Sequence, residues 1–421
     1  MPEEVAPITV EEALEAVLAR FHPLDAEEVP LLQALDRVLA EDIVAGEDIP
    51  PFENSAMDGY AVRGEEVAGA RRDTPVRLRV IGEVAAGMPA TVPVEPGTAV
   101  RIMTGAPMPP GADTVVPFEQ TDEAGPEGER EPGWVRVLVP VSPGSNVRAA
   151  GEDVRRGERV LERGTRLRPQ EVGLLAALGR PIVRVTRRPR VVILATGDEL
   201  VEPGEPLAPG KIRNSNAYSN YAQVLKYGGE PLKLPIARDR FEDLSARIDE
   251  GLAAGVDLFL TSGGVSVGEY DLVKKVLASR GKISFWRVRM QPGRPMAFGE
   301  IDGVPLLGLP GNPVSSMVSF ILFVRPVLLK MQGQRALRLP EVTATLLEDA
   351  RAQPDRPRFL RAIVEQEDGR FTARLTGPQG SGILSSMVRA NGLAVIPESA
   401  YPAARAGTTV RVLMFDWPEI L

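Results

Sequence analysis

Apolar and polar residues follow a helical period at the start of the chain. Thr9 followed by Glu12 forms a capping box, and the residues behind it predict an amphipathic helix over residues 10–21. The apolar positions of this helix are Leu14, Val17, Leu18 and Phe21. A second helix is predicted from the next apolar positions at helical spacing, which are Leu31, Leu32, Leu35, Val38 and Leu39.

The period changes between residues 49 and 143. Proline and glycine recur there, and alternating runs such as VRLRVIGEV, AVRIM and WVRVLVPV replace the helical spacing. Short alternating runs between turn residues are typical of strands, so this segment is predicted to be a separate small β domain. A short helix is predicted in the sequence RGTRLRPQEVGLLAALG that follows.

Three apolar runs of another kind come next. RVVILATG, DLFLTSGG and VPLLGLPG are nearly continuous in apolar residues, end in glycine and precede helical patterns. Parallel strands that are covered by helices on both faces have this pattern, which predicts an open α/β sheet over residues 177–330. Alternating runs return after Gly333 and predict a terminal β barrel or sandwich.

Composition narrows the possible partners. A chain of 421 residues is long enough for about two to four domains. The net charge of -8 argues against broad nucleic-acid binding, and the absence of cysteine excludes disulfides and thiolate metal sites. The acidic start does not resemble a secretion signal, and the most apolar helix, SMVSFILFVRPVLL, carries Arg325. We therefore expect a cytoplasmic protein that binds neither nucleic acid nor membrane.

Candidate chemistry lies in three turns at the carboxyl edge of the predicted sheet. There, helix starts and glycines present free amide groups to an anionic ligand. The turns are Thr261–Asp271 (TSGGVSVGEYD), Pro310–Ser315 (PGNPVS) and Thr196–Leu200 (TGDEL). They predict a cradle for phosphate or pterin, with a carboxylate of the third turn available for magnesium. Tight strand-to-helix turns, helix capping and solvated carboxylates are the alternative interpretations of the same residues.

The residues 264–268 also fit the nucleophile elbow G-x-S-x-G of hydrolases. Such a serine needs a general base, and the single histidine, His22, lies far upstream, opposite to the order found in that fold. The sequence therefore disfavours a serine hydrolase. With one histidine and no cysteine, a transition metal handled here must be held by ligands on the substrate.

Six motifs that occur in order along the chain resemble the molybdopterin molybdenumtransferase family, whose relatives include the C-terminal domain of gephyrin. They are PPFENSAMDGYAV at 50–62, VRIMTGAPMPPGADTVV at 100–116, NVRAAGEDV at 146–154, TGDEL, TSGGVSVGEYD, and LPGNPVS at 309–315. The resemblance implies an elongated helical domain (1–48 and 144–176), an inserted β domain (49–143), a molybdopterin-binding α/β domain (177–335) and a C-terminal β barrel (336–421).

The resemblance also implies a homodimer whose site lies between the α/β domain of one subunit and the inserted domain of the other. It implies catalytic or metal-binding roles for Asp271, Glu199, Asp239 and Asp58, with magnesium at Glu199 and Asp239. The substrate-binding residues that it implies are Thr104, Arg148, Asp153, Ser262, Gly263, Gly264, Ser266, Pro310, Gly311, Asn312, Pro313 and Ser315.

Molybdate in this family meets a K-P-G-K-P pattern, an arginine and a serine. The matching residues are Gln291, Arg294, Arg361 and Ser381, so Gln291 replaces a lysine and removes one positive charge. Arg287, Arg289 and Arg294 can supply charge in its place, because a guanidinium donates paired hydrogen bonds to an oxyanion.

The implied reaction is molybdenum insertion into adenylylated molybdopterin with release of AMP. Its substrates are molybdate and adenylylated molybdopterin, and its candidate protein partners are molybdopterin adenylyltransferase and molybdoenzyme acceptors. Two alternatives remain, namely a molybdopterin adenylyltransferase, which resembles the α/β domain alone, and a non-catalytic scaffold like gephyrin.

Overall fold

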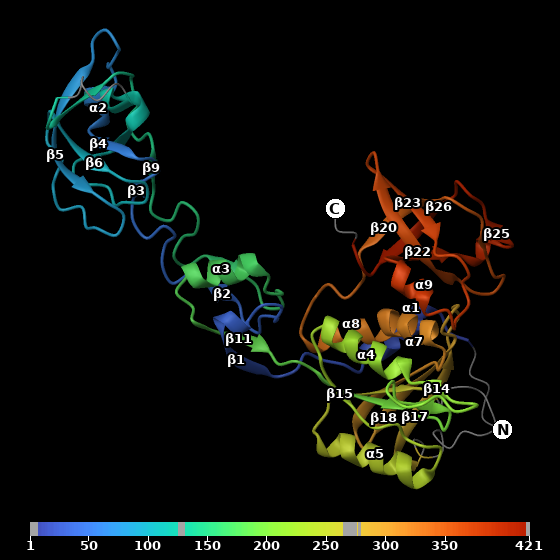
Figure 1. The fold of residues 1–421 in the computed structure, drawn as a ribbon. Helices are drawn as coiled ribbons and strands as arrows, with labels where there is room; N and C mark the ends of the chain where they lie inside the picture. Colours follow the sequence, from blue (N-terminus) through green and yellow to red (C-terminus); the bar gives the residue numbers. More distant parts are fainter. Residues whose placement is uncertain (1–6, 125–130, 264–275, 277–278, 418–421) are drawn as a thin grey trace.

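The protein is elongated, with a separate β-sheet domain at one end and two packed domains at the other (Figure 1). The computed structural model describes residues 7–124, 131–263, 276 and 279–417. Three predicted site residues, Gly264, Ser266 and Asp271, lie outside the described residues.

The first helix begins as predicted, and the second is absent. Helix α1 (Val10–Leu18) has the capping box of Thr9 and Glu12. The residues expected to form the second helix instead make one short turn of 3-10 helix, Leu31–Gln33. Asp36 then takes a left-handed backbone conformation (φ 64°), and Leu32 is 94% exposed. The helical prediction was therefore wrong because this spacing of leucines does not correspond to one buried face.

Two small sheets and one helix form the narrow middle of the molecule. Strand β1 (Ala26–Pro30) pairs with β11 (Ile182–Thr186), and β2 (Ile43–Val44) pairs with β10 (Arg159–Leu161). Helix α3 (Pro169–Ala177) lies where a short helix was predicted, and its Leu175 is buried with residues of these sheets. Residues from both ends of the first half of the chain thus share one core.

The inserted domain is a five-stranded sheet in the order β7-β4-β6-β5-β8. Its strands are β4 (Gly59–Val62), β5 (Val76–Val84), β6 (Thr98–Ile102), β7 (Thr114–Pro117) and β8 (Trp134–Val137). A short pair, β3 (Asn54–Ser55) with β9 (Val147–Arg148), joins it to the middle of the molecule. Both faces of the sheet are covered, because separate clusters of buried apolar residues pack on its two sides.

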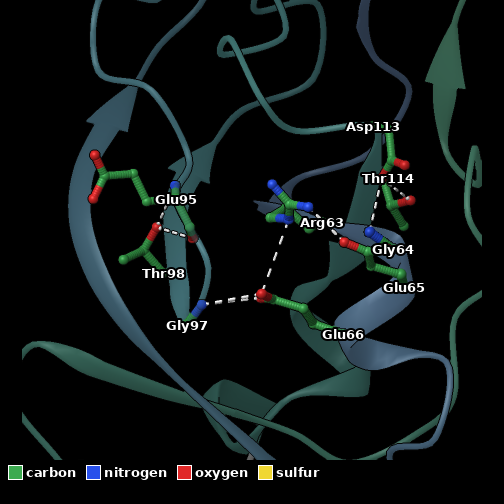
Figure 2. A network of polar contacts seen from close by, with 9 residues as sticks. All are labelled: Arg63, Gly64, Glu65, Glu66, Glu95, Gly97, Thr98, Asp113 and Thr114. Carbon is green, nitrogen blue, oxygen red and sulfur yellow. Dashed lines mark hydrogen bonds and ion pairs between the residues drawn. The ribbon is translucent and has the colours of Figure 1, made fainter.

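Figure 2 shows a polar network that holds the end of β4 and the short helix α2 (Gly64–Val67) within this domain. Asp113 accepts the Gly64 N–H at 2.7 Å, and Glu66 accepts the Gly97 N–H at 3.1 Å. Arg63 lies 3.9 Å from the Glu66 carboxylate. Each of these contacts joins residues of the inserted domain to one another, which gives the network a structural role.

The α/β domain contains a six-stranded sheet in the order β15-β12-β16-β19-β18-β17. The first four strands are parallel to one another, as predicted for the three apolar runs. Strand β18 pairs antiparallel with β19, and β17 pairs antiparallel with β18. The strands are β12 (Arg190–Ala195), β15 (Glu230–Lys233), β16 (Leu258–Ser262), β17 (Gly281–Arg287), β18 (Pro295–Ile301) and β19 (Val304–Leu309). A two-stranded sheet of β13 (Leu200–Val201) and β14 (Ile212–Arg213) lies between β12 and the next helix.

Helices cover both faces of this sheet (Figure 1). Helix α5 (Phe241–Ala253) packs on the side of Val192 and Leu194, whereas α4 (Ser215–Lys226) packs on the side of Val191 and Ile193. Burial on both faces explains why β12, β16 and β19 carry runs of consecutive apolar residues rather than alternating ones.

A long apolar helical stretch, Pro313–Met331, follows β19 and lies on the same side as α4. It consists of α7 (Pro313–Ser319), a π-helical turn (Phe320–Val324) and α8 (Arg325–Met331). It has 19 residues, and its most apolar 18-residue window has a mean hydropathy of 1.6 and is 83% buried inside the protein. In the described part of the chain this stretch alone has the length and composition of a membrane span, and its burial is that of a core helix.

The C-terminal domain is a closed barrel in the order β20-β23-β22-β24-β26, which decides between the predicted barrel and sandwich. Its strands are β20 (Glu341–Leu346), β22 (Arg358–Glu367), β23 (Arg370–Leu375), β24 (Gly392–Ile396) and β26 (Thr409–Met414). Helix α9 (Ser385–Arg389) packs on β22, and a small sheet of β21 (Ala350–Arg351) and β25 (Ala403–Ala404) lies beside the barrel.

Candidate functional site

The three predicted turns meet at one edge of the α/β sheet. Strands β12, β16 and β19 are neighbours, and the Gly263 N–H donates to the Leu309 carbonyl at 3.2 Å. A Cβ at Gly263 would lie 3.2 Å from the Thr196 carbonyl oxygen, and a Cβ at Gly311 would lie 3.8 Å from the Gly263 Cα. Ser262 ends β16 and is 4% exposed. A side chain at Gly263 would crowd the Thr196 turn, whereas the space in front of Gly311 is open to a ligand.

The start of α4 completes this edge, and the sequence interpretation missed it. Asn216 donates its amide to the Gly311 carbonyl at 2.7 Å, and Asn214 caps α4 by accepting the Ala217 N–H. Asn214 Nδ2 and Asn216 Oδ1 are buried without hydrogen-bond partners. Buried polar atoms of this kind need a partner, so they point to a bound polar ligand. The signal was the sequence RNSN directly before a helical pattern.

The Pro310–Ser315 turn opens α7. Pro313 is the first helical residue and Asn312 precedes it, with an exposed side chain that does not cap the helix. Ser315 is buried in the first turn of the helix, whereas Gly311 is exposed. Pro310, Gly311, Asn312 and Pro313 thus lie together beside the Gly263 turn, as the register of β16 and β19 requires.

Carboxylates lie beside the first turn. Asp198 and Asp239 hold each other's loops, because the Asp198 N–H donates to Asp239 at 3.4 Å and the Asp239 N–H donates to Asp198 at 3.3 Å. Glu199 is exposed next to Asp198, and Lys211 and Arg238 donate to the backbone of this turn. Among the residues that the structure describes, no three carboxylate or histidine side chains are grouped closely enough to hold a metal ion by themselves.

A buried arginine lies on the barrel side of the site. Arg361 is fully buried, donates from Nε to the Ser386 hydroxyl at 2.9 Å and from Nη2 to the Gly380 carbonyl at 3.1 Å. Its Nη1 is buried and has no partner. Burial, with the nearby charge of Arg358 as a smaller cause, lowers the pKa of the Arg361 guanidinium to about 10. A guanidinium in this state favours an anion as neighbour, because an anion supplies both charge and acceptors.

The loop at Gln291 connects the barrel to α7. Gly293 packs on α7, where an added Cβ would lie 2.6 Å from the Ser319 hydroxyl, and this hydroxyl has no partner. The Ser381 carbonyl accepts the Val314 N–H at 3.0 Å, which places Ser381 between α7 and the Gly380–Arg361 contact. Gln291 and Arg294 are exposed at the surface of this loop. Ser381 thus lies near Arg361, whereas Arg294 lies at the surface.

The predicted residues of the inserted domain form a second, separate group. Asp58 accepts both the backbone N–H and the hydroxyl of Thr104, each at 2.7 Å. These bonds hold the pKa of the Asp58 carboxyl below its usual value. Arg148 and Asp153 are exposed on the chain that leaves this domain. The inserted domain lies at the other end of the molecule from the α/β sheet, so one chain does not bring Asp58 and Thr104 to the glycine turns (Figure 1).

A large surface cavity lies elsewhere. It has a volume of about 850 Å³ and is lined by residues of α1, of the helix ending at Met331 and of the barrel, but by none of the predicted site residues. A smaller cavity, of about 230 Å³, is lined by Arg294 and four other residues.

Glycine turns at the carboxyl edge of an α/β sheet are typical of a class of proteins that bind anionic, nucleotide-like ligands. Three family profiles match this chain in order: MoeA N-terminal region (domain I and II) at residues 8–179, probable molybdopterin binding domain at 192–330, and MoeA C-terminal region (domain IV) at 343–415. The chain belongs to the molybdopterin molybdenumtransferase family, a family of transferases.

Relatives match over almost the whole length. Molybdopterin molybdenumtransferase 2 of Mycobacterium tuberculosis is 41% identical over 390 residues, which cover 91% of this chain and 94% of that protein. The Bacillus subtilis molybdopterin molybdenumtransferase is 36% identical over 99% of this chain and 98% of that protein. A crystal structure of the molybdopterin biosynthesis MoeA protein from Pyrococcus horikoshii, 36% identical, matches with a TM-score of 0.82 over 97% of this chain and 100% of that one.

Proposed function

We propose that this protein inserts molybdenum into adenylylated molybdopterin and releases AMP. The contact between the glycine turns at Gly263 and Gly311 carries the proposal. Helix α7 of the same α/β domain is hydrogen-bonded to Ser381, which follows the Gly380 that the buried Arg361 contacts. Such a site can hold a pyrophosphate and a tetrahedral oxyanion side by side. The names of the relatives agree with this reaction.

The roles proposed for individual residues rest on the resemblance and, for the described residues, on their positions. Ser262, Gly263, Pro310, Gly311, Asn312, Pro313 and Ser315 would bind the pterin and phosphates, together with Gly264 and Ser266. Asp271 would orient water for cleavage of the phosphoanhydride, whose P–O bond breaks as water forms a new one and AMP leaves. Arg361 and Ser381 would hold molybdate, with Gln291 and Arg294 on the surface side. The reaction then depends on positioning and charge neutralisation rather than on a side-chain nucleophile.

Glu199 and Asp239 are the proposed magnesium ligands. Magnesium keeps several waters and needs only one or two protein carboxylates when substrate phosphates supply the other oxygens. Two exposed carboxylates beside the Thr196 turn fit this need without a closed protein site. Magnesium bound there would neutralise charge on the pyrophosphate.

We further propose a homodimer in the cytoplasm, in which Asp58, Thr104, Arg148 and Asp153 of one subunit complete the site of the other. The observation behind this is their distance from the glycine turns within one chain (Figure 1). The four-domain division at residues 1–48 with 144–176, 49–143, 177–335 and 336–421 is part of the same proposal, as are handover contacts with molybdopterin adenylyltransferase and molybdoenzymes.

The central experiment supplies adenylylated molybdopterin, magnesium and molybdate and measures AMP and active cofactor together. Both products are expected to appear in parallel, and chelation of magnesium is expected to stop both. Cofactor without AMP would contradict the proposed cleavage, and absence of both products would remove the proposed reaction.

Substitution of Gly311 tests whether the turn touches the substrate. Gly311→Val is expected to weaken binding of adenylylated molybdopterin by about 10- to 100-fold, because the valine side chain would occupy the space in which the substrate approaches the Gly311 backbone. The fold has room for it, since an added Cβ meets only the Gly263 Cα at 3.8 Å. Gly173→Val is the control, because Gly173 lies in α3 and an added Cβ there meets no atom within 4 Å. Equal losses of binding in the Gly311 and Gly173 variants would contradict the contact.

A further inference from the structure

We propose that Arg101 is a positioning residue, which holds the turn that presents the Asp58 carboxylate to the substrate. It acts through Tyr60, Phe118 and Glu123. These residues lie in the inserted domain, on β4, on β6 and on the two turns of 3-10 helix, Phe118–Gln120 and Asp122–Ala124, that follow β7. The expected effect on AMP release rests on the proposed function, whereas the expected effect on the Asp58 turn concerns contacts within one chain.

The strand register places Arg101 close to the contact between Asp58 and Thr104. Strands β4 and β6 are antiparallel neighbours, and Tyr60 lies opposite Arg101. Residues opposite each other in an antiparallel pair have their side chains on the same face. Asp58 directly precedes β4, and Thr104 follows the end of β6 at Ile102. The Tyr60 and Arg101 side chains therefore share a face of the sheet at the end where Asp58 is held.

Glu123 joins these two side chains. Its carboxylate accepts the Tyr60 hydroxyl at 2.7 Å and Arg101 Nη1 at 2.7 Å. The Arg101 and Glu123 side chains are 32% and 16% exposed, so water and salt screen their ion pair only in part. Burial, and then the bond to Glu123, raises the pKa of the Tyr60 hydroxyl, which therefore stays protonated and donates at neutral pH. The guanidinium of Arg101 is thus held in one direction.

Phe118 connects Arg101 to Asp58. The Arg101 guanidinium lies 4.4 Å from the centre of the Phe118 ring, and the Tyr60 ring meets the same ring edge-on at 5.5 Å. The Phe118 N–H donates to the Asp58 carbonyl at 3.2 Å. Phe118 therefore holds the backbone of Asp58, whereas Thr104 holds its carboxylate. Without the guanidinium, the Phe118 ring would lose a cation–π contact and the Asp58 turn would lose part of its support.

Arg101 also supplies charge near Asp58. The hydrogen bonds from Thr104 lower the pKa of the Asp58 carboxyl, and the positive charge of Arg101 lowers it further. A reaction that depends on positioning needs its carboxylate ionised and fixed, because small displacements of a reacting group slow the reaction strongly. Arg101 meets both needs through its neighbours.

Arg77 offers a matched control in the same domain. Its guanidinium lies 3.6 Å from the centre of the Trp134 ring, and its Nε donates to Glu131 at 3.0 Å. Arg77 lies on β5, and β6 separates β5 from β4 in the sheet. A substitution of Arg77 therefore removes the same kinds of contact, an aromatic ring and a glutamate, away from the Asp58 turn.

The rate of AMP release tests the positioning role. Arg101→Gln is expected to lower kcat about 10- to 100-fold and to keep the KM for adenylylated molybdopterin within about twofold, because a displaced carboxylate slows the reaction more than it weakens binding. Arg101→Lys keeps the positive charge and is expected to recover part of the rate. Arg77→Gln is expected to keep both kcat and KM. Equal kcat values of Arg101→Gln and Arg77→Gln would overturn the proposal.

Amide hydrogen exchange of the full-length protein, at single-residue resolution, provides a measurement that does not depend on activity. In Arg101→Gln the Thr104 and Phe118 amides are expected to exchange about 10-fold faster, because both donate to Asp58. Arg77→Gln is expected to keep the wild-type rates at both amides. Unchanged exchange in Arg101→Gln would overturn the proposal.

Faster exchange throughout the inserted domain of Arg101→Gln would overturn it as well, because Arg101 would then only stabilise the fold. Glu123→Gln is expected to have the same local effect, and the double variant no larger one, since both residues act through one contact. If the wild type forms no AMP but exchange responds to Arg101 as expected, the proposed function fails while the positioning of Asp58 stands.

Discussion

Two inactive variants mixed in one solution are expected to regain about a quarter of the wild-type rate of AMP release. The variants are Asp58→Ala and Arg361→Gln. In a dimer with shared sites, each mixed dimer has one site that carries both substitutions and one site that carries neither. Random exchange of equal amounts makes about half of the dimers mixed, and each of these has one of its two sites intact.

The expectation follows from where the two residues lie. Asp58 is exposed between β3 and β4 of the inserted domain, and Arg361 is buried in the barrel at the other end of the molecule (Figure 1). If both act on one substrate, they must come from different chains. Two differently tagged variants, purified through both tags, give the mixed dimer directly. No recovery in that purified species would contradict the shared site, and Asp58→Ala mixed with Thr104→Val is the control that should stay inactive, because both changes affect the same half-site.

Arg361→Gln alone is expected to weaken molybdate binding at the buried site about 100-fold or more, because an oxyanion there would lose a buried, charged partner. The guanidinium is held by Ser386 and Gly380 and leaves Nη1 free, so its remaining donors already have a fixed direction. Arg361→Lys keeps the positive charge but loses the paired planar donors of the guanidinium, so its molybdate affinity is expected to lie between those of the wild type and Arg361→Gln. Molybdate titration and thermal unfolding of both variants check this, and wild-type affinity of a folded Arg361→Gln would exclude the arginine from the site.

Anion binding at the Arg361 site is expected to weaken as the pH rises into the alkaline range. The pKa of Arg361 is lowered to about 10, so the guanidinium is charged at neutral pH and becomes neutral as the pH rises through that value. Anion affinity at the buried site should therefore be constant near neutrality and fall above about pH 10.

The sequence pattern predicted the α/β sheet correctly but predicted a helix at residues 31–39 that the structure lacks. Strands buried on both faces are mostly apolar, and β12, β16 and β19 carry nearly continuous apolar runs. Leu32 and Leu35 have helical spacing too, but both are exposed, and Asp36 turns the backbone away from a helix. Local spacing does not reveal which apolar residues will have a neighbour to pack against.

The candidate site shows the same division. Parallel strands end at one edge, so the meeting of the Gly263 and Gly311 turns was predictable from chain order. Asn216 was missed because its role depends on a contact with Gly311, far along the chain. The position of Arg294 at the surface also depends on long-range contacts, here those of the Gln291 loop with the barrel.

The inserted domain is attached at one place. The chain enters and leaves it side by side, since the Ile49 N–H donates to the Val154 carbonyl at 2.7 Å and the two residues form an isolated antiparallel bridge. Everything between them has its own core, as the clusters on both faces of its sheet show. A substitution in the core of that module is consequently expected to disturb its own packing and to leave the cores of the barrel and the α/β sheet intact.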